Sequence, residues 1–388
     1  MPTRIYLDHN ATAPLRTAAR DAMVRALDVT GNPSSIHADG RATRGIIEEA
    51  RVKVADLVGA EARHVVFASG GTEAACLALT PHLRVSGKQI GRILVSAGEH
   101  TCVLTGHRFP ADRVDVIGLT PDGVVDLGAL RAALEHNTDH PPVLALQAAN
   151  NETGVHHPVA EAAALMREAG GITICDAVQA AGRIPLNIHE LGADALLLSA
   201  HKFGGPKGVG ALVIDTGRLH IDETLVRGGG QERGLRGGTE NVAGIAGFGA
   251  AAGEALASLS AEPTRLFGLR DLFENRLREL FGDCVIFGAG VPRLPNTTAF
   301  ALPGVGAETL LIALDLAGVS ASSGSACSSG KVRPSHVLTA MGVDPELAKG
   351  VIRISTGWNT TQNDVEGLCG ALEKAVSSIR KRRDRTAA

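Results

Sequence analysis

Short apolar segments alternate with helical patterns from about residue 45 to residue 215, and this alternation constrains the fold more than any other feature. The apolar segments are continuous runs, which is typical of strands whose two faces are both covered by helices. The predicted strands span residues 64–69, 92–97, 143–149, 171–176, 195–200 and 209–215, and helices are predicted at 45–59 and 159–170. This alternation predicts an α/β domain with a mostly parallel sheet.

Polar residues follow five of these predicted strands. The segments are "ASGGTE", "GEH", "NNETG", "DAVQ" and "SAHK", in chain order. In open parallel sheets, ligands bind in a crevice at the carboxyl ends of the strands. Packing alone does not explain five polar strand ends, so we expect these residues to line one ligand site.

The sequence pattern changes in the last third of the chain. A glycine-rich connector at 227–241 leads into an alanine-rich helix, and a further helix is predicted at 265–282, followed by short strands and more helices. We predict a large α/β domain at 15–260. Residues 1–14 and 261–388 are predicted to form a smaller α+β domain, which carries a mobile cysteine loop at about 321–334 and is joined to the large domain as a single unit.

Charge and cysteine usage exclude several classes of protein. The net charge of −3 supports neither a nucleic-acid nor a membrane-surface role, and the basic run at 379–385 is interpreted as a solvated helix end. Six scattered cysteines without a CxxC pair argue against a disulfide framework or a structural zinc site. The N-terminus lacks a signal pattern and no apolar run approaches 18 residues, so we expect a cytoplasmic protein without membrane contact.

Lys202 and Asp176 are the first candidates for chemistry. Lys202 follows an apolar strand, where partial desolvation would lower its pKa and suit it to Schiff-base formation, although an isolated lysine there is more often a surface residue. Asp176 ends another apolar run, where it is either a helix N-cap or a buried carboxylate that needs a partner. A Schiff-base lysine and an aspartate for a ring nitrogen together satisfy the needs of pyridoxal phosphate, PLP.

A phosphate group would also find donors in this sequence. Gly70, Gly71 and Thr72 lie at an expected helix N-terminus, which is a natural anion site. Ser199 and His201, beside Lys202, can add side-chain donors.

Three further residues are candidates for contacts with a cofactor ring. His100 follows a strand and can stack on the ring, although a lone histidine is more often structural. Asn151 and Gln179 can donate hydrogen bonds to a ring hydroxyl. None of the three alone is specific evidence for a cofactor site, and each supports one only together with the others.

One cysteine, Cys327, lies in "SSGSACSSG", a run that can neither fill a core nor make a good helix. Taken alone, the run indicates a surface loop with an incidental thiol. Beside a PLP site, the same thiol becomes a candidate nucleophile.

At this point the chain resembles the cysteine desulfurases, of the class V aminotransferase group of fold-type I PLP enzymes. The motifs that carry the resemblance include "IYLDHNATAP", "FASGGTEA", "NNETG", "DAVQAAGRIP", "SAHKFGGPKGVG" and "GGGQERGLRGGTEN". "SSGSAC" followed closely by "PSHVL" is the most specific element and is similar to the NifS and IscS subgroup. The resemblance implies a fold-type I transferase with a mostly parallel seven-stranded-type sheet.

The resemblance also implies residue roles. Lys202 would carry the cofactor and remove a substrate proton, Asp176 would pair with the pyridine nitrogen, and His100 would stack on the ring. His100 is also a catalytic candidate, since either this histidine or the substrate thiol can accept the proton of Cys327. The remaining implied contacts are Gly71, Thr72, Ser199 and His201 to the phosphate, Thr239 to the phosphate from the other subunit of a homodimer, Gln179 to the ring hydroxyl, and Asn151 and Arg353 to the substrate carboxylate. Without the family, Arg353 is equally a surface salt-bridge residue.

The implied activity removes sulfur from L-cysteine, gives L-alanine, and leaves a persulfide on Cys327 for an acceptor such as an iron–sulfur scaffold protein. No resident metal is expected, although Cys327 can contact an iron–sulfur cluster during transfer. Iron–sulfur assembly is the commonest destination of the sulfur, while tRNA thiolation and nitrogenase maturation stay open. The alternatives are a selenocysteine lyase, another fold-type I enzyme such as an aminotransferase, and a non-catalytic sulfur carrier.

Overall fold

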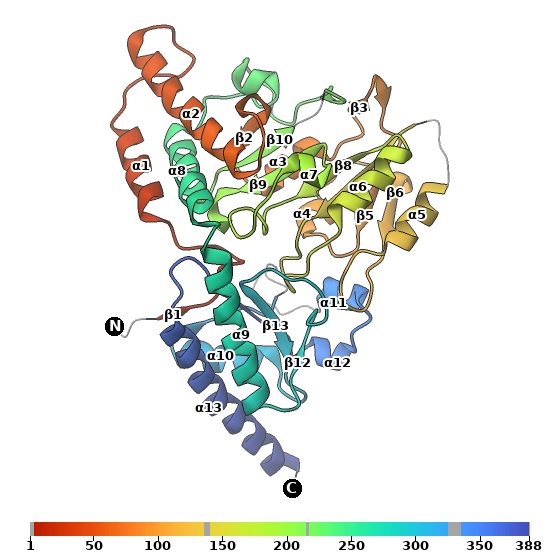
Figure 1. Cartoon of the computed structure of the whole chain (residues 1–388), viewed down its shortest axis with the longest axis vertical. Coiled ribbons are helices and arrows are strands. Elements are labelled where there is room, and N and C mark those ends of the chain that lie inside the picture. Colours follow the sequence, from red (N-terminus) through yellow and green to blue (C-terminus); the bar gives the residue numbers. More distant parts are fainter. Residues whose placement is uncertain (1–3, 136–139, 215–216, 325–334, 388) are drawn as a thin grey trace.

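A seven-stranded sheet forms the centre of the computed structural model, which describes residues 4–135, 140–214, 217–324 and 335–387 (Figure 1). Its strands, in spatial order, are β2 (Val65–Ala68), β10 (Gly210–Ile214), β9 (Ala195–Ser199), β8 (Ile172–Asp176), β7 (Pro142–Gln147), β5 (Arg92–Ser96) and β6 (Val114–Ile117). Only β10 runs antiparallel to its neighbours. The predicted mostly parallel sheet is therefore confirmed.

The predicted strands match six of the seven strands to within about two residues, and β6 was not predicted. Its sequence, Val114–Ile117, lies at the sheet edge, where the Val116 side chain is 63% exposed. An edge strand with one open face lacks the continuous apolar run that marks a strand covered on both faces.

Helices cover the two faces of the sheet, and alternate residues of each strand point into different apolar cores. In β2, Val65 and Phe67 belong to the core shared with α2 (Ala38–Leu57) and α8 (Val242–Ser258), whereas Val66 and Ala68 face the core of α3 (Gly71–Ala78). The predicted helix at 45–59 thus begins earlier, at Ala38, where the His37 side chain accepts a hydrogen bond from Gly40 N. Burial on both faces accounts for the continuous apolar runs in the sequence.

The alanine-rich helix α8 packs closely on its neighbours because it carries glycine at the contact points. A Cβ atom at Gly249 would lie 2.5 Å from the Cα atom of Ala50 on α2. This backbone-to-backbone approach excludes larger side chains and holds α2 against the sheet.

A second group of elements lies below the seven-stranded sheet and its helices in Figure 1. It has an antiparallel sheet of β12 (Val285–Ile286), β13 (Thr297–Ala301) and β15 (Ile352–Ser355), with α9 (Glu262–Leu280), α10 (Ala307–Leu316) and α13 (Gln362–Ala387). The N-terminal strand β1 (Ile5–Tyr6) pairs in parallel with β14 (Val319–Ser320), and Leu7 packs into the same apolar core as Phe273 and Phe300. The exact domain boundaries stay a prediction.

Shorter elements complete the chain. They are α1 (Thr17–Leu27), α4 (Thr101–Leu104), α5 (Leu127–Glu135), α6 (Val159–Glu168), α7 (Ile188–Leu191), α11 (His336–Ala340), α12 (Pro345–Ala348), a small sheet of β3 (Leu83–Val85), β4 (Lys88–Gln89) and β11 (Leu219–Ile221), and 3-10 turns at Ala62–His64, Ala111–Arg113, Ala200–Lys202 and Gln231–Gly234. Among the described residues no single helix is long and apolar enough to cross a membrane, and α8 and α9 pass that test only as a pair bent by 76°.

Candidate active site

A cavity of about 470 Å³ opens at the carboxyl ends of the central strands. Nine of the predicted site residues line it, namely Gly71, Thr72, His100, Asn151, Asp176, Gln179, Ser199, His201 and Lys202. They come from the segments that follow β2, β5, β7, β8 and β9. The structure therefore brings the five polar strand ends together, as the sequence pattern predicts.

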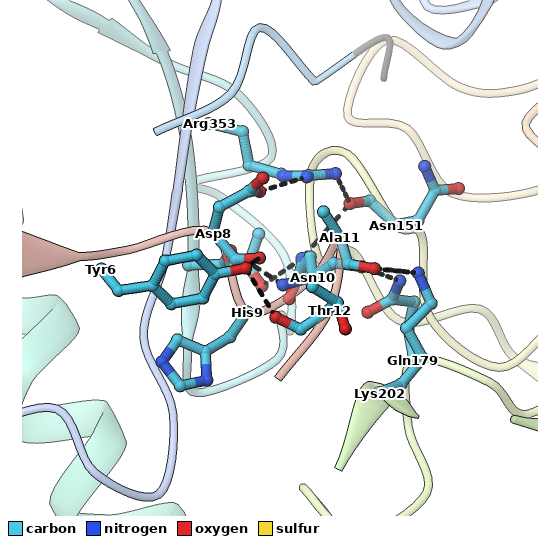
Figure 2. Close-up of polar contacts among 12 residues, drawn as sticks. Tyr6, Asp8, His9, Asn10, Ala11, Thr12, Asn151, Gln179, Lys202 and Arg353 are labelled. Carbon is cyan, nitrogen blue, oxygen red and sulfur yellow. Dashed lines mark hydrogen bonds and ion pairs between the residues drawn. The ribbon is translucent and has the colours of Figure 1, made fainter. Parts of the chain in front are cut away.

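Lys202 lies in the 3-10 turn that follows β9. Its Nζ donates hydrogen bonds to the carbonyl oxygens of Asn10, at 2.8 Å, and Ala11, at 3.0 Å (Figure 2). Burial, followed by the positive charges of Arg183 and Arg353, lowers the pKa of Lys202 to about 8. A larger share of this amine than of an ordinary lysine is thus neutral and nucleophilic near neutral pH.

Asp176 is the last residue of β8 and is 9% exposed. Its Oδ1 accepts a hydrogen bond from the Val178 backbone N–H at 2.9 Å, so the carboxyl caps the following turn. Burial raises the pKa of Asp176 to about 6, against the opposing effects of that hydrogen bond and of Lys202. A cation bound at this carboxylate, such as a protonated ring nitrogen, would offset the cost of its buried charge.

The first turn of α3 provides a cradle for an anion. Gly70 is the N-cap residue, and a Cβ atom added at Gly71 would lie 3.1 Å from Val178 Cγ2, so a side chain there would crowd the wall of the cavity. Across the cavity, His201 Nδ1 is buried and has no hydrogen-bond partner within the described part of the chain. Free helix N–H groups, this unpaired imidazole nitrogen and Ser199 form a donor set that fits a phosphate group.

Two further cavity residues are already engaged by the protein. His100 Nδ1 accepts a hydrogen bond from Cys102 N at 3.2 Å, and burial followed by the charge of Lys202 lowers the pKa of this histidine, which favours its neutral form. Gln179 Nε2 donates to Asn10 O at 3.0 Å, while its carbonyl oxygen accepts from Arg183. Their neutral, fixed side chains suit contacts with a ring rather than proton transfer.

Arg353 does not line the cavity but lies behind its wall. The residue is 1% exposed on β15, and its guanidinium pairs with Asp8 Oδ1 and donates to the Asn151 carbonyl, both at 2.8 Å (Figure 2). The alternative of a surface salt bridge is wrong, since this ion pair holds a buried arginine. Its predicted contact with the substrate carboxylate stays a prediction.

The structure does not bring the other two predicted residues into the described cavity lining. Thr239 is exposed in the glycine-rich connector and is not among the cavity residues. Cys327 lies outside the described residues. The chain on either side of its segment is fixed close to the cavity, because Ser322 exchanges backbone hydrogen bonds with Arg353 and Ser335 Oγ donates to Glu152 Oε2 at 2.5 Å.

Several residues at the site were missed by the sequence analysis. The most notable are Glu99 and Arg183, which are buried beside the cavity, and Cys102, which lines it. Glu99 and Arg183 stand in the segments "GEH" and "AGRIP", so a charged residue directly after an apolar strand or turn was the available signal. Cys102 carried no such signal, because its position depends on how α4 packs.

Comparisons with known proteins agree with this geometry. The "Aminotransferase class-V" family matches residues 5–368. The chain is 41% identical over 385 residues to "Cysteine desulfurase IscS" of Dictyoglomus turgidum, covering 98% of this chain and 96% of the relative. It is 39% identical to the "IscS-like cysteine desulfurase" of Mycobacterium tuberculosis, covering 97% of each chain.

Solved structures lead to the same family. The crystal structure of a NifS-like protein from Rickettsia africae superposes with a TM-score of 0.87 at 34% identity, covering 96% of this chain and 99% of that one. A second NifS-like protein gives a TM-score of 0.83 at 31% identity, covering 97% and 100%. The resemblance and the fold-type I architecture inferred from the motifs are confirmed, and the chain belongs to the class-V aminotransferase family.

Proposed function

We propose that this protein is a PLP-dependent cysteine desulfurase, which converts L-cysteine to L-alanine and delivers the sulfur to an acceptor. The observation that carries the proposal is the pairing, in one cavity, of a lysine with a lowered pKa and an aspartate with a raised pKa. Perturbed groups of opposite charge in a single cavity are typical of a catalytic site. The relatives named cysteine desulfurase support the choice of reaction.

The described residues fit the cofactor at three points. The first turn of α3, with Ser199 and His201, would hold its phosphate, Asp176 would pair with its ring nitrogen, and Lys202 would anchor it. When bound, PLP supplies an electron sink for the charge that develops as a substrate proton leaves.

Lys202 is the group that moves the proton. Its neutral amine accepts a proton at Nζ, and the carbonyl oxygens of Asn10 and Ala11 then hold the resulting ammonium group. The positive charges of the nearby Arg183 and Arg353 disfavour the ammonium form, which helps Lys202 to return the proton. A positioned base of this kind contributes about 10²- to 10⁴-fold to the rate.

Sulfur transfer is assigned to Cys327. Its thiolate attacks the sulfur of the substrate cysteine, and the Cβ–S bond of the substrate breaks. The electron pair of that bond stays with the three-carbon fragment, which gains a proton and leaves as L-alanine. L-Cysteine and one protein thiol thereby become L-alanine and one protein persulfide, without an outside oxidant or reductant.

The partners belong to the same proposal. We place the protein in the cytoplasm as a homodimer in which Thr239 reaches the phosphate site of the other subunit. The acceptor would be a protein thiol, such as an iron–sulfur scaffold. The name IscS carried by a relative favours iron–sulfur assembly over the other destinations.

The direct test measures products. The purified protein with PLP, L-cysteine and a thiol reductant should release alanine and sulfide in equal amounts. Amino-group transfer from L-cysteine to a 2-oxo acid, without sulfide, would contradict the proposal and indicate an aminotransferase. Faster release of selenide from selenocysteine would instead indicate a selenocysteine lyase.

The lowered pKa of Lys202 predicts how the apoprotein captures its cofactor. Only the neutral amine reacts with an aldehyde, so the capture rate should rise about tenfold per pH unit below pH 8 and level off above it. Stopped-flow absorbance after mixing apoprotein with PLP gives this rate. A rise that continues to pH 10, as for an ordinary lysine, would contradict the assignment.

Replacing Arg353 with lysine tests the predicted contact with the substrate carboxylate. Lysine keeps the charge beside Asp8 but lacks the planar fork that contacts two partners at once. Loss of one hydrogen bond to a charged group, about 1.5–3 kcal/mol, would lower kcat/KM for L-cysteine by about 10- to 150-fold. Arg380→Lys, at an exposed ion pair with Asp283, is the matched control. Unchanged kcat/KM in Arg353→Lys would assign this arginine a structural role only.

A further inference from the structure

Glu99 is a buried carboxyl that the proposed mechanism does not use. The residue is 0% exposed, its Oε1 accepts a hydrogen bond from the Gln147 backbone N–H at 2.7 Å, and its Oε2 has no hydrogen-bond partner in the part of the chain that the structure describes. Gln147 ends β7 directly opposite Asp176, the last residue of β8. The Glu99 carboxyl, which follows β5, is thus bonded to the end of β7, the strand that lies between β5 and the Asp176 strand β8.

Within the described part of the chain, no positively charged group is bonded to the Glu99 carboxyl. Asp176 and Cys175 face it from β8, and Cys102 faces it from α4. His336, on α11, approaches the backbone rather than the carboxyl, with Nε2 2.9 Å from the Glu99 carbonyl oxygen. The titratable side chains that face Glu99 from β8 and α4 are therefore acidic, and His336 is bound to the main chain.

An ionised carboxylate is unfavourable in this position for two reasons. A single neutral N–H donor does not replace the hydration lost on full burial, and the charge of Asp176 repels a second negative charge. Burial first, and Asp176 second, raise the pKa of Glu99 well above its usual range. Asp176 has the Val178 N–H and the nearby Lys202 to stabilise its own charge.

We propose that Glu99 is a positioning residue held as a neutral carboxylic acid behind Asp176, so that Asp176 provides the single negative charge at this end of the cavity. The consequence for PLP rests on the proposed function. A cationic ring nitrogen then faces one carboxylate, whose position is fixed through the paired ends of β7 and β8. The charge state of Glu99 itself is independent of the reaction that the enzyme catalyses.

The neutral state has a consequence for stability at alkaline pH. A carboxyl whose pKa is raised on folding stabilises the fold only while it is protonated, and that stability is lost as the pH rises through the folded-state pKa. In Glu99→Gln, the amide keeps the shape and cannot ionise. We therefore expect the free energy of unfolding to fall less steeply in this variant than in the wild type as the pH rises above about 4.3, the pKa of an unfolded glutamate.

Infrared difference spectra test the protonation directly. At pH 8, where Asp176 with its pKa of about 6 is ionised, the wild-type holoenzyme minus Glu99→Gln should show the carbonyl band of a protonated carboxylic acid, which shifts in D₂O. A difference that contains only carboxylate bands would overturn the proposal. The same measurement on apoprotein gives an answer even if the enzyme proves to catalyse another reaction.

Two further variants make the test specific. Glu152 is another buried carboxyl with a raised pKa, so Glu152→Gln removes the other candidate for such a band and must leave the Glu99 band in place. If Glu99→Gln does not fold, a carboxylic-acid band that persists in Glu152→Gln still shows that Glu99 is protonated. By equilibrium dialysis, the affinity of Glu99→Gln for PLP should lie within about threefold of that of the wild type. An equal loss of PLP affinity in Glu99→Gln and Glu99→Ala would overturn the role of a neutral acid.

Discussion

Replacing Lys202 with alanine is expected to remove the visible absorbance of the covalently bound cofactor and to lower alanine formation by at least about 10²- to 10⁴-fold. The variant loses both the anchor of the cofactor and the base that moves the substrate proton. Absorbance of the purified protein measures the first loss, and single-turnover alanine formation measures the second. The fold should be retained, because Lys202 contacts only the Asn10 and Ala11 carbonyl groups through its side-chain amine.

A second lysine in the cavity provides the matched control. Lys207 also lines the cavity, but it is exposed, whereas the Lys202 amine is held inside by two backbone carbonyl groups. Lys207→Ala should therefore keep the absorbance band that Lys202→Ala loses. The reverse result would assign the anchor to Lys207, and loss of the band in both variants would point to a collapsed cavity.

Much of this site follows from local sequence patterns, because each strand is short, apolar and followed directly by polar residues. Asp176 and Lys202 are recognisable as a pair, since each alone also fits a helix N-cap or a surface lysine, whereas the two together satisfy the needs of PLP. The same reasoning fails for β6, whose exposed Val116 breaks the apolar pattern. Local patterns thus predict strands that are buried on both faces, including the edge strand β2, better than a strand with an exposed face.

The partners of the predicted residues could not be read from the sequence. Lys202 is held by the carbonyl oxygens of Asn10 and Ala11, about 190 residues away. Every residue type has a backbone carbonyl, so the identity of residues 10 and 11 does not indicate this contact. Arg353 is held by Asp8, which reaches it because the N-terminal segment joins the C-terminal core through β1 and β14. Such contacts form only when the N-terminal segment packs against parts of the chain that are about 190 to 350 residues away.

Glu99 shows a different limit of sequence reasoning. Glu99 follows β5 but was not predicted as a site residue, and its charge state depends on Asp176 and Gln147, which come from two other strands. The sequence identifies Glu99 but does not show how many hydrogen-bond donors surround its carboxyl group. The orphaned Oε2 appears only when the strands are assembled.

Replacing Cys327 with alanine should leave cofactor and L-cysteine binding intact while lowering the release of alanine and sulfide by about 10²-fold or more, as expected when a group that acts only in the chemical step is removed. Absorbance changes on adding L-cysteine measure binding, and mass spectrometry of the protein measures the persulfide. Cys284→Ala, which removes a thiol next to β12 and far along the chain from the cavity residues, is the control and should keep full activity.

The rival to Cys327 is Cys102, the thiol that lines the cavity. Burial first, and the negative charge of the nearby Asp176 second, raise the pKa of Cys102, so its thiolate is scarce at neutral pH. Because the thiolate is the nucleophile, a thiol in this environment is a poor acceptor of sulfur. Persulfide on Cys102 in the wild type, or full turnover in Cys327→Ala that disappears in Cys102→Ala, would transfer the role to Cys102. A persulfide confined to Cys327 would instead separate the two tasks of the site, with proton transfer at Lys202 inside the cavity and sulfur transfer by a thiol from another part of the chain.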